Sequence, residues 1–405
     1  MSELEEACVH MGLDCTARHC NMLSEISFHG MDLEKTERWS IRALGIQSNS
    51  VTALHHAALV AWNHHERQAA MDMVRKCLLI QPRHRGALDL LILLDSENHQ
   101  TCRPETRDKI ERLRKKKGAL SIGIHTHSDR ETDPEMRLLW GDHWVRQELG
   151  KELSGLGFEQ DRTRPDINIH LFGSPARNID DTALNMVWLH SHPDMATTEN
   201  LRPFDYIFCA SSHFLPTLTA MGYLNVELMP ACTSKTPIQV PVEHDMIFLG
   251  NARESRSDGR AIVGDMIATG LDFKVWGNLW EGILPPKNYG GRYWDYERLE
   301  ELYASAKITL NDHHPDMERE GFVSNKVFDI LASGGFVISG KNKGLAPLFE
   351  DAVPEYESPE HLKKIVEYYL DHSEKRRCLM EKGQKIALTH TYAERAIQFT
   401  RKWVV

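Results

Sequence analysis

From residue 119 onward, short apolar runs alternate with amphipathic segments, and this alternation constrains the possible folds more than any other feature of the sequence. Short apolar runs bounded by turn residues are typical of buried strands. In the first half of this region they are Ala119–His125, Ile167–Phe172, Met186–Leu189 and Tyr206–Ala210. An amphipathic segment, Trp140–Gly157, separates the first two. Strands that alternate with helices predict a parallel sheet with crossover helices.

The alternation restarts after a linker bounded by Pro237 and Pro241. The predicted strands are Met246–Leu249, Phe273–Trp276, Ile308–Leu310 and Phe336–Ser339. The predicted helices lie around 258–268, 295–306, 325–333 and 360–388. The sequence therefore predicts two Rossmann-like domains, 118–238 and 239–388. Ligands of such sheets bind beyond the carboxyl ends of the strands, so we expect a binding cleft between the domains.

An internal repeat precedes the two domains, in residues 1–102. IQS at 46–48 recurs as IQP at 80–82, and AL at 53–54 recurs at 87–88, an offset of 34 residues in both cases. This period is typical of tetratricopeptide (TPR) repeats, whose units are pairs of antiparallel helices. The predicted helices are 33–46, 50–64, 66–80 and 85–95. Such a region either caps the next domain or offers a concave surface to a protein or peptide.

Two further segments are predicted to be helical and structural. Residues 103–117 are strongly charged and helix-prone after Pro104, which is typical of a solvated connecting helix. Residues 389–405 form an amphipathic pattern, for which we expect a C-terminal helix that crosses back to the first Rossmann-like domain.

Charge and composition exclude several classes of protein. A net charge of −10 argues against a non-specific nucleic-acid binder, which neutralises phosphates with basic residues. The longest apolar runs, such as Leu90–Leu94, fall far short of the roughly 20 residues of a membrane-spanning helix. The N-terminus is acidic, unlike a signal peptide. The eight cysteines include no C-x-x-C pair, which is typical of reduced thiols. We therefore expect a cytoplasmic protein with no nucleic-acid partner and no membrane span.

The cysteines and histidines near the N-terminus are candidates for a zinc site, namely Cys8, His10, Cys15, His19 and Cys20. Their spacings match none of the usual zinc knuckles. Cys8 and Cys15 would share one face of a helix, where small residues are commonly buried. We expect packing rather than metal binding.

The segment around Ser324 carries the most specific chemical signal. A predicted strand ends at Asn311, a polar loop follows, and a helix begins near Ser324. A helix N-terminus that points into a cleft offers unpaired N–H groups and a positive dipole end to a diphosphate. Lys326 adds a point charge, and Asp329 lies on the same helix face as Asn325, where its carboxylate can accept from two ribose hydroxyls. The alternative is a structural helix, with Ser324 as an N-cap and Asp329 as a surface charge.

Three segments resemble the group 1 glycosyltransferases, in the branch similar to the spore-maturation protein CgeB. They are KITLN at 307–311, SNKVFDILASGGFVIS at 324–339 and THTYAERA at 389–396. The resemblance is strong over residues 245–400 and weaker at Trp140–Trp144 and Trp188–Asp194. It implies the α/β architecture called GT-B, two Rossmann-like domains that face a cleft, here after an all-α TPR-like domain. The second domain of that family holds most of the nucleotide sugar.

The resemblance also implies roles for individual residues. The family's ribose-binding acid falls on Asp329 and its basic partner on Lys326. Its phosphate-side loop falls on Gly250 and Asn251, followed by three arginines, and its base-pocket strand falls on Trp276 and Gly277. Many relatives pair two glutamates eight positions apart, the first of which contacts the donor sugar, whereas here the nearest acid before Asp329 is Glu320, nine positions away. The expected donor-binding residues are Gly250, Asn251, Arg256, Arg260, Trp276, Gly277, Asn311, Ser324, Asn325, Lys326 and Asp329.

The chemistry of glycosyl transfer suggests how the phosphate charge is met and which residues act as base. Metal-dependent transferases commonly use D-x-D, but no two aspartates here are two positions apart. We therefore expect neither metal nor cofactor, with the charge met by the helix end, Lys326 and arginines. Candidate bases are Asp142, His190 and His192 in the first domain. Alternatively, Asp142 caps its helix and the histidines bond to backbone. For His313 and His314, after the strand ending at Asn311, we expect donor contacts.

The sequence thus predicts a metal-independent hexosyltransferase that moves a sugar from a nucleoside-diphosphate donor, with UDP-sugars favoured, to an acceptor hydroxyl. The helical repeats suggest a protein acceptor, and a glycan acceptor is the other option. A second hypothesis is a nucleotide-sugar epimerase of the same fold, which needs no acceptor surface. A third is a non-catalytic TPR adaptor whose α/β domains have lost activity.

Overall fold

The computed structural model of the chain divides into two compact units. One comprises residues 1–118, 155–157 and 396–405, and the other residues 119–154 and 158–395. The structure describes residues 16–401 apart from 82–83, 88–89, 91–93, 95–102, 174–175, 177–178, 224 and 254–258. Cys8, His10 and Cys15 of the proposed N-terminal cluster therefore lie outside the described residues.

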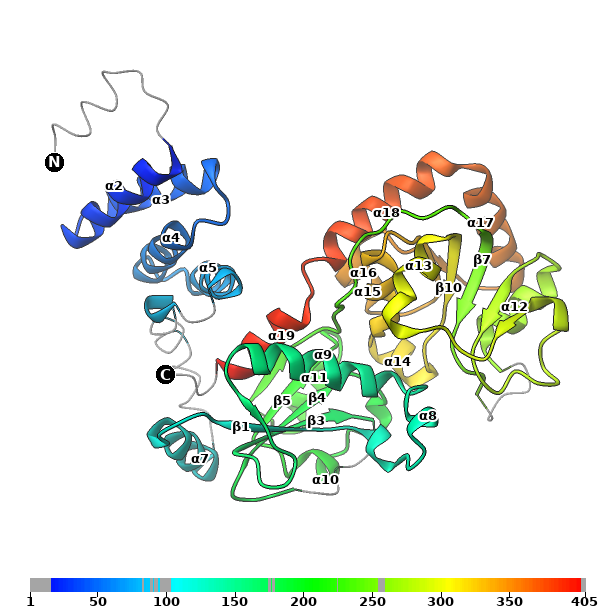
Figure 1. Cartoon of the computed structure of the whole chain (residues 1–405), viewed down its shortest axis with the longest axis horizontal. Helices are drawn as coiled ribbons and strands as arrows, with labels where there is room; N and C mark the ends of the chain where they lie inside the picture. The colour runs from blue at the N-terminus through cyan, green and yellow to red at the C-terminus, as the bar shows by residue number, and fades with distance from the viewer. Residues whose placement is uncertain are drawn as a thin grey trace. The chain divides into compact units, whose positions relative to one another are not determined.

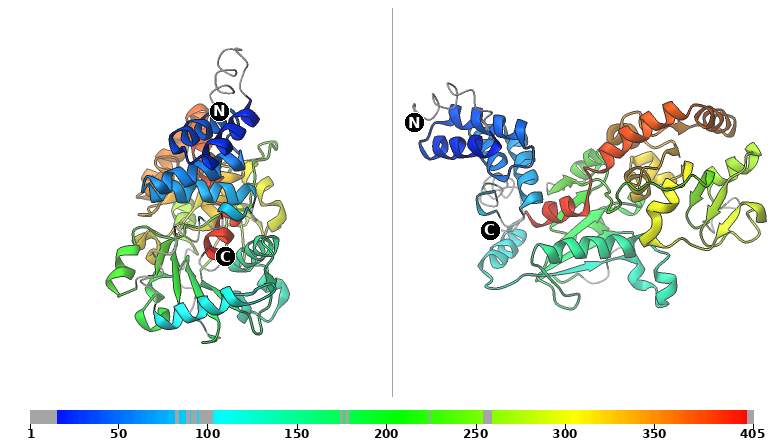
Figure 2. Two further views of the ribbon diagram at one scale, coloured as in Figure 1. Left: turned by 90° about the vertical axis from the view of Figure 1, so that its left-hand side faces the viewer. Right: turned by 45° about the horizontal axis from the view of Figure 1, so that its top comes forward.

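The first unit begins with helices that pack in sequence order (Figure 1; Figure 2). They are α2 (Ala17–His29), α3 (Leu33–Ile46), α4 (Val51–Asn63) and α5 (Arg67–Ile80). Side-chain caps set three of the four starts, because Thr16 accepts from the N–H of His19, Asp32 from that of Lys35 and Ser50 from that of Ala53. Short connections make successive helices antiparallel neighbours. Small buried residues, Ala57, Ala58 and Ala70, allow close packing.

These helices match the predicted 33–46, 50–64 and 66–80 to within a residue at either end. Helix α2 was not predicted, because the repeat in the sequence begins after it. The predicted helix 85–95 falls largely on residues that are not described. The charged segment 103–117 forms α7 (Pro104–Lys115). The described helices are consistent with a helical repeat, and the TPR assignment stays a prediction.

The second unit contains two six-stranded sheets, in which every strand pair is parallel. The first sheet has the order β2-β1-β3-β4-β5-β6. Its strands are β1 (Ser121–His125), β2 (Glu159–Gln160), β3 (Ile167–Phe172), β4 (Leu184–Leu189), β5 (Tyr206–Cys209) and β6 (Val226–Leu228). Strands β3, β4 and β5 are wholly buried, which explains why they read as continuous apolar runs.

The second sheet has the order β12-β11-β10-β7-β8-β9, and its chain order reverses between β7 and β10. Its strands are β7 (His244–Leu249), β8 (Lys274–Trp276), β9 (Tyr289–Gly291), β10 (Ala306–Asn311), β11 (Val337–Gly340) and β12 (Glu355–Tyr356). The neighbouring helices are α12 (Ala261–Thr269), α13 (Leu299–Ala304), α15 (Asn325–Ala332), α17 (Pro359–Asp371) and α18 (Ser373–Ala387). Two buried apolar clusters pack on this sheet and its helices.

The predicted strands of both halves are present, with ends that differ by one or two residues. Strands β2, β6, β9 and β12 were missed, since runs of two or three residues carry no periodic signal. The predicted helix 360–388 is two helices, α17 and α18, that meet at His372. The C-terminal helix is α19 (Tyr392–Thr400), and its Arg395 donates to the carbonyl of Pro230, just beyond β6.

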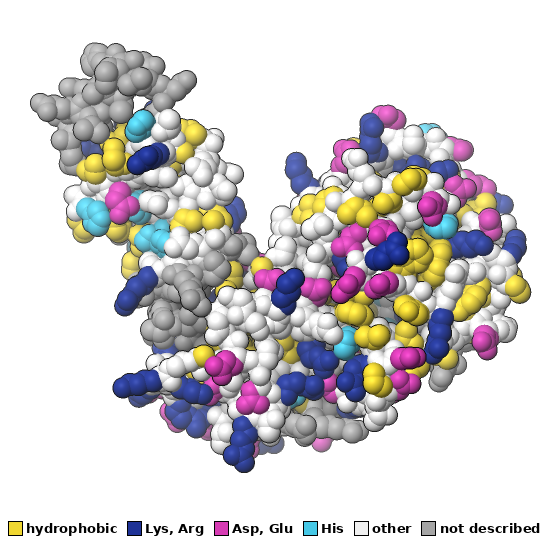
Figure 3. All heavy atoms as spheres, in the orientation of Figure 1, with side chains coloured by type: hydrophobic (Ala, Val, Ile, Leu, Met, Phe, Trp, Pro, Cys, Tyr) yellow, Lys and Arg dark blue, Asp and Glu magenta, His cyan; other side chains and the backbone are white. Residues whose placement is uncertain are grey.

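On the face drawn in Figure 3, acidic and basic side chains of the described residues are interspersed. Within the described part of the chain, no helix combines the length and apolar character needed to cross a bilayer.

Candidate active site

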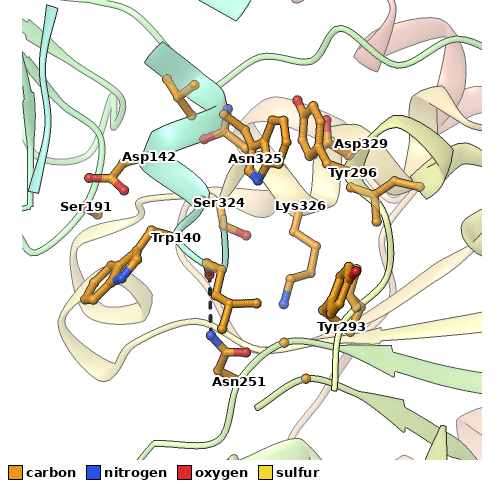
Figure 4. Close-up of a pocket in the computed structure, with 18 of the residues that line it drawn as sticks. Trp140, Asp142, Ser191, Asn251, Tyr293, Tyr296, Ser324, Asn325, Lys326 and Asp329 are labelled. Carbon is orange, nitrogen blue, oxygen red and sulfur yellow. Dashed lines mark hydrogen bonds between the residues drawn. The ribbon is translucent and has the colours of Figure 1, made fainter. Parts of the chain in front are cut away.

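A cavity of about 590 Å³ lies beyond the carboxyl ends of strands from both sheets. One wall belongs to the second domain and includes the loops after β7 and β10 and the start of α15. The other belongs to the first domain and includes residues 138–142, 144–145 and 190–192. The wall at β7 and β10 is the point where the chain order of the second sheet reverses, which is where ligands of such sheets bind. Figure 4 shows the two walls, with Asp142 on one and Lys326 on the other.

Helix α15 is anchored by its apolar face. Val327, Phe328, Ile330 and Leu331 are fully buried, which fixes the helix against the core of the second domain. Its first turn, starting from Ser324, lines the cavity. The side chain of Ser324 makes no capping bond, and its buried Oγ has no hydrogen-bond partner among the described residues. The structure therefore does not support the reading of Ser324 as a side-chain N-cap, and leaves a polar atom at the helix N-terminus for a ligand.

Lys326 extends from this turn into the middle of the cavity (Figure 4). Its Nζ lies 4.8 Å from the ring centroid of Phe248, and a Cβ on Gly250 would come within 3.1 Å of it. Burial, followed by the nearby positive charge of Arg260, lowers the pKa of Lys326 to about 7. A bound anion would reverse that shift, so this amine is suited to meet a negative charge.

Asp329, one turn further along α15, is held by Thr233 of the segment that connects the domains. Thr233 Oγ1 donates to Asp329 Oδ1 at 2.6 Å. Burial raises the pKa of Asp329 to about 7, and this hydrogen bond opposes the rise. The ring of Tyr296 lies beside Asp329 in Figure 4 and stacks on Trp144 with 4.2 Å between ring centroids. Near pH 7 both the protonated and the ionised form of this carboxyl group are therefore accessible to a polar ligand group at this end of the cavity.

Two arginines and a buried aspartate lie behind Lys326. Arg260 donates through Nε to the carbonyl of Asn251 at 2.8 Å and through a terminal nitrogen to Asp312 at 3.0 Å. Arg253 forms an ion pair with the same aspartate at 3.8 Å. This pairing fixes both guanidinium groups against the loop after β7. Arg256, expected to bind the donor, lies outside the described residues.

The loops after β7 and β8 touch through glycines. Gly277 has φ +148°, and a Cβ on it would meet the carbonyl oxygen of Gly250 at 2.1 Å. Asn251 Oδ1 accepts from the N–H of Asn278, and its Nδ2 contacts the carbonyl of Leu139 at 3.5 Å, the dashed line in Figure 4. Gly250, Asn251 and Gly277 line the cavity as expected, and glycine is needed at 277 because the backbone of Gly250 approaches it so closely.

Asp142 presents a free carboxylate oxygen on the first-domain wall. Helix α9 (Gly141–Gly155) starts one residue before it. Its Oδ2 accepts from the N–H of Ser128 at 2.9 Å, and its Oδ1 is buried without a hydrogen-bond partner among the described residues. The alternative that Asp142 caps its own helix is therefore wrong, because the carboxylate accepts from a different segment.

The two candidate histidines follow β4. Burial lowers the pKa of His190 to about 4, although the charge of Asp142 opposes this, and its Nδ1 has no hydrogen-bond partner in the described structure. His192 has a left-handed backbone at φ 52°, an uncommon conformation that is often found at functional sites. Its Nδ1 lies 3.1 Å from Ser191 Oγ, and its ring centroid lies 4.9 Å from that of His314. The ring of His190 also interacts with the backbone of Trp188, as expected if the histidines bond to backbone. That interaction does not account for its Nδ1, which has no hydrogen-bond partner among the described residues.

The structure corrects two of the expected donor contacts, because two of the side chains lie outside the cavity lining. Trp276 is buried in the core of the second domain, with its ring 5.6 Å from that of Trp294. Asn311 donates to Ser339 Oγ at 3.0 Å inside the sheet. Asn325 lines the cavity, but its amide donates to the carbonyl of Cys232 at 2.8 Å and so also joins α15 to the segment between the domains.

Several lining residues were not predicted as site residues. Arg253 was noted after the loop but not chosen, and nothing in the local sequence identifies Tyr293, Tyr296 or Tyr392. His313 and His314, for which we expected donor contacts, do line the cavity.

Comparison with known proteins finds a family that matches part of the chain. Residues 256–401 match the protein family described as "Glycosyl transferase-like". No curated protein matches the chain in sequence.

Solved structures with a similar arrangement include three bacterial or phage enzymes. The T4 phage β-glucosyltransferase, solved with UDP and Mn²⁺, has a TM-score of 0.50 and 13% identity and covers 71% of this chain and 100% of its own. Sucrose-phosphate synthase of Thermosynechococcus elongatus has a TM-score of 0.47 and 12% identity and covers 70% of this chain and 97% of its own. An O-GlcNAc transferase of Thermobaculum terrenum has a TM-score of 0.41 and 11% identity and covers 96% of this chain and 97% of its own. The two parallel-sheet domains of this chain thus have the GT-B fold of the phage enzyme, and residues 256–401 are glycosyl transferase-like in sequence.

Proposed function

We propose that the chain is a glycosyltransferase that moves a sugar from a nucleoside-diphosphate donor, with UDP-sugars favoured, to an acceptor hydroxyl. The observation that carries this proposal is the cavity at the reversal point of the second sheet, where a helix N-terminus, the buried cation Lys326 and the carboxyl group of Asp329 line one wall. These groups match, in order, what a diphosphate and a ribose require.

The diphosphate would lie against the first turn of α15. The unpaired N–H groups of that turn, Ser324 Oγ and Lys326 Nζ are all available to phosphate oxygens. Arg253 and Arg260 add positive potential from behind the loop after β7. As the bond from the anomeric carbon to the diphosphate oxygen breaks, the electron pair leaves on the diphosphate, and these groups stabilise the developing charge.

The proton of the acceptor hydroxyl would pass to the first-domain wall. Asp142 is the best placed of the three candidates, because its Oδ1 is buried, unpaired and at the cavity surface. Burial lowers the pKa of His190 to about 4, so its ring is neutral near pH 7 and can donate or accept a hydrogen bond. We assign His190 and His192 to holding the acceptor or to relaying its proton.

The acceptor is proposed to be a protein or a glycan. The helices α2 to α5 give the chain a repeat-like region that the transfer chemistry itself does not need, and such regions commonly bind protein or peptide partners. A protein acceptor recruited by these helices is therefore the version that we favour.

A thermal-shift series with UDP, GDP, CDP and dTDP tests the donor class. Stabilisation by at least one of them is expected, since a ligand that binds only the folded state raises the Tm. Stabilisation by none would favour the adaptor hypothesis. Turnover of the sugar nucleotide that proceeds without any added acceptor and yields an epimer would favour the epimerase.

We further propose that the reaction needs no metal. The positively charged groups around the diphosphate supply the stabilisation that a divalent cation gives in other transferases. Transfer rates measured in excess EDTA are expected to stay within about twofold of those with added Mg²⁺ or Mn²⁺. Loss of activity in EDTA that returns with Mn²⁺ would contradict the proposal. The phage enzyme was solved with Mn²⁺, so this is a demanding test.

The affinity for UDP-glucose is expected to be greatest near pH 7. Phosphate stabilises the charged form of Lys326 and so raises its pKa from about 7, which means that this contribution is present below pH 7 and is lost as the pH rises. Ribose hydroxyls stabilise ionised Asp329 and lower its pKa from about 7, so its contribution is lost as the pH falls.

Calorimetric titration of UDP-glucose, whose diphosphate does not titrate in this range, measures both limbs of the profile. Lys326→Met is expected to remove the alkaline limb, and Asp329→Asn the acidic limb. A flat profile for the unmodified protein would show that neither group is coupled to the donor.

A further inference from the structure

The loop that follows β10 contains a histidine whose ring makes no hydrogen bond within the described part of the chain. His313 is buried, with 3% of its surface exposed, and it lines the cavity. Neither of its ring nitrogens has a hydrogen-bond partner among the described residues. Buried polar atoms in folded proteins are nearly always bonded, and two such atoms on one ring indicate a ligand that completes the site.

The position of His313 identifies which part of a donor would meet it. Lys326, Arg253 and Arg260 are close enough to act on the charge of its ring, so it lies at the diphosphate end of the cavity. The next residue, His314, lies with its ring 4.9 Å from that of His192 on the first-domain wall. The chain at His313 and His314 therefore runs from the phosphate-binding groups towards the wall proposed to hold the acceptor. In a nucleotide sugar, the transferred sugar occupies that interval.

Two carboxylates of the segment after β10, Glu320 and Asp312, have charged partners of their own. Glu320 lies outside the cavity lining and accepts from Arg319 at 2.9 Å. Asp312 is paired with Arg260 and Arg253. Asp312 Oδ2 also makes no hydrogen bond among the described residues, but it is ion-paired with Arg253, whereas His313 offers both of its ring nitrogens.

We propose that His313 binds hydroxyl groups of the transferred sugar and determines which sugar is accepted, in place of the glutamate that many similar enzymes use. This inference rests on the proposed function. Burial lowers the pKa of His313 to about 3, so the ring is neutral at physiological pH and offers one donor and one acceptor. That pair complements two neighbouring hydroxyls of an uncharged sugar, whereas an anionic sugar such as a uronate would require a cation.

The test uses His313→Leu, which removes both hydrogen-bonding atoms at similar volume, together with His313→Asn and His313→Gln. These two variants place an amide near the position of Nδ1 or Nε2, respectively. Binding of UDP, UDP-glucose and the monodeoxy analogues of UDP-glucose is measured by calorimetry. A buried histidine outside the cavity, His170, supplies the matched control His170→Leu. Its Nε2 also lacks a partner in the described structure.

We expect His313→Leu to weaken UDP-glucose binding about 10-fold and UDP binding less than twofold. Removal of the sugar hydroxyl that His313 binds should cost affinity in the unmodified protein and nothing further in His313→Leu. One of the two amide variants should recover most of the loss. His170→Leu should leave the ratio of the two affinities unchanged.

An equal loss for UDP and UDP-glucose would overturn the proposal, because it would mean that His313 acts on the diphosphate. The proposal would also be overturned if, for every deoxy analogue, the loss of binding free energy from the missing hydroxyl were the same in His313→Leu as in the unmodified protein. If His313→Leu does not fold, the two amide variants decide. A sugar contact predicts that the affinities of His313→Asn and His313→Gln differ for UDP-glucose and become equal for the analogue that lacks the contacted hydroxyl. Equal affinities of the two variants for every analogue would contradict the proposal. The proposed function fails in a different way, namely if the unmodified protein binds no nucleoside diphosphate or nucleotide sugar.

Discussion

Replacement of Asp142 by asparagine is expected to lower kcat for glycosyl transfer by about 100-fold or more, the range that general base catalysis supplies. Asparagine keeps the size of the side chain and can still accept the hydrogen bond from the N–H of Ser128. It cannot accept the acceptor's proton at the position of the unpaired Oδ1. Initial rates with saturating donor and acceptor measure the effect.

Because Asp142 contacts neither the helix N-terminus of α15 nor Lys326, the affinity of Asp142→Asn for UDP should stay within about twofold of that of the unmodified protein. Asp161→Asn is the matched control, since Asp161 lies in a turn outside the cavity and accepts from the N–H of Thr163. A kcat of Asp142→Asn close to that of the control would exclude Asp142 as the base and leave His190 or His192.

Replacement of Lys326 by methionine is expected to weaken UDP binding by about 10- to 100-fold, the size of a hydrogen bond to a charged group. Methionine retains the packing on Phe248 but has no charge. Uridine carries no phosphate, so its affinity should change by less than about threefold. Calorimetric titration of both ligands separates the two effects.

Lys307→Met is the control for Lys326→Met, because Lys307 pairs with Asp245 near the amino ends of β7 and β10, away from the cavity. It should leave both affinities unchanged. An equal loss for UDP and uridine in Lys326→Met would mean that the lysine supports the shape of the site rather than the phosphates.

The parts of the fold that could be predicted are those whose signal is local. Strands β3, β4 and β5 bury both faces, so each appears as an apolar run, and α15 combines an amphipathic pattern with a polar start at Ser324. The edge strands β2 and β12 have two residues each, too few for any period to be visible. The strand order is not visible in a single sequence either, and it determines where the cavity lies.

The candidate site was predictable where one segment supplies it, as from Ser324 to Asp329. The contacts that join distant segments were not, since Thr233 and Asp329 are 96 positions apart and Trp144 stacks on Tyr296 across the two domains. Trp276 was placed near the ligand by the family resemblance and Asn311 by its position at the end of a strand, but each side chain points into the core or the sheet. The direction in which the side chain of a strand's last residue points depends on the packing of the whole domain.

The most direct test of the account is a crystal structure with UDP bound. We expect the diphosphate to contact Ser324 and Lys326 at the start of α15 and the ribose hydroxyls to bind Asp329. Nucleotide density at any other place, or a diphosphate remote from Lys326, would contradict it.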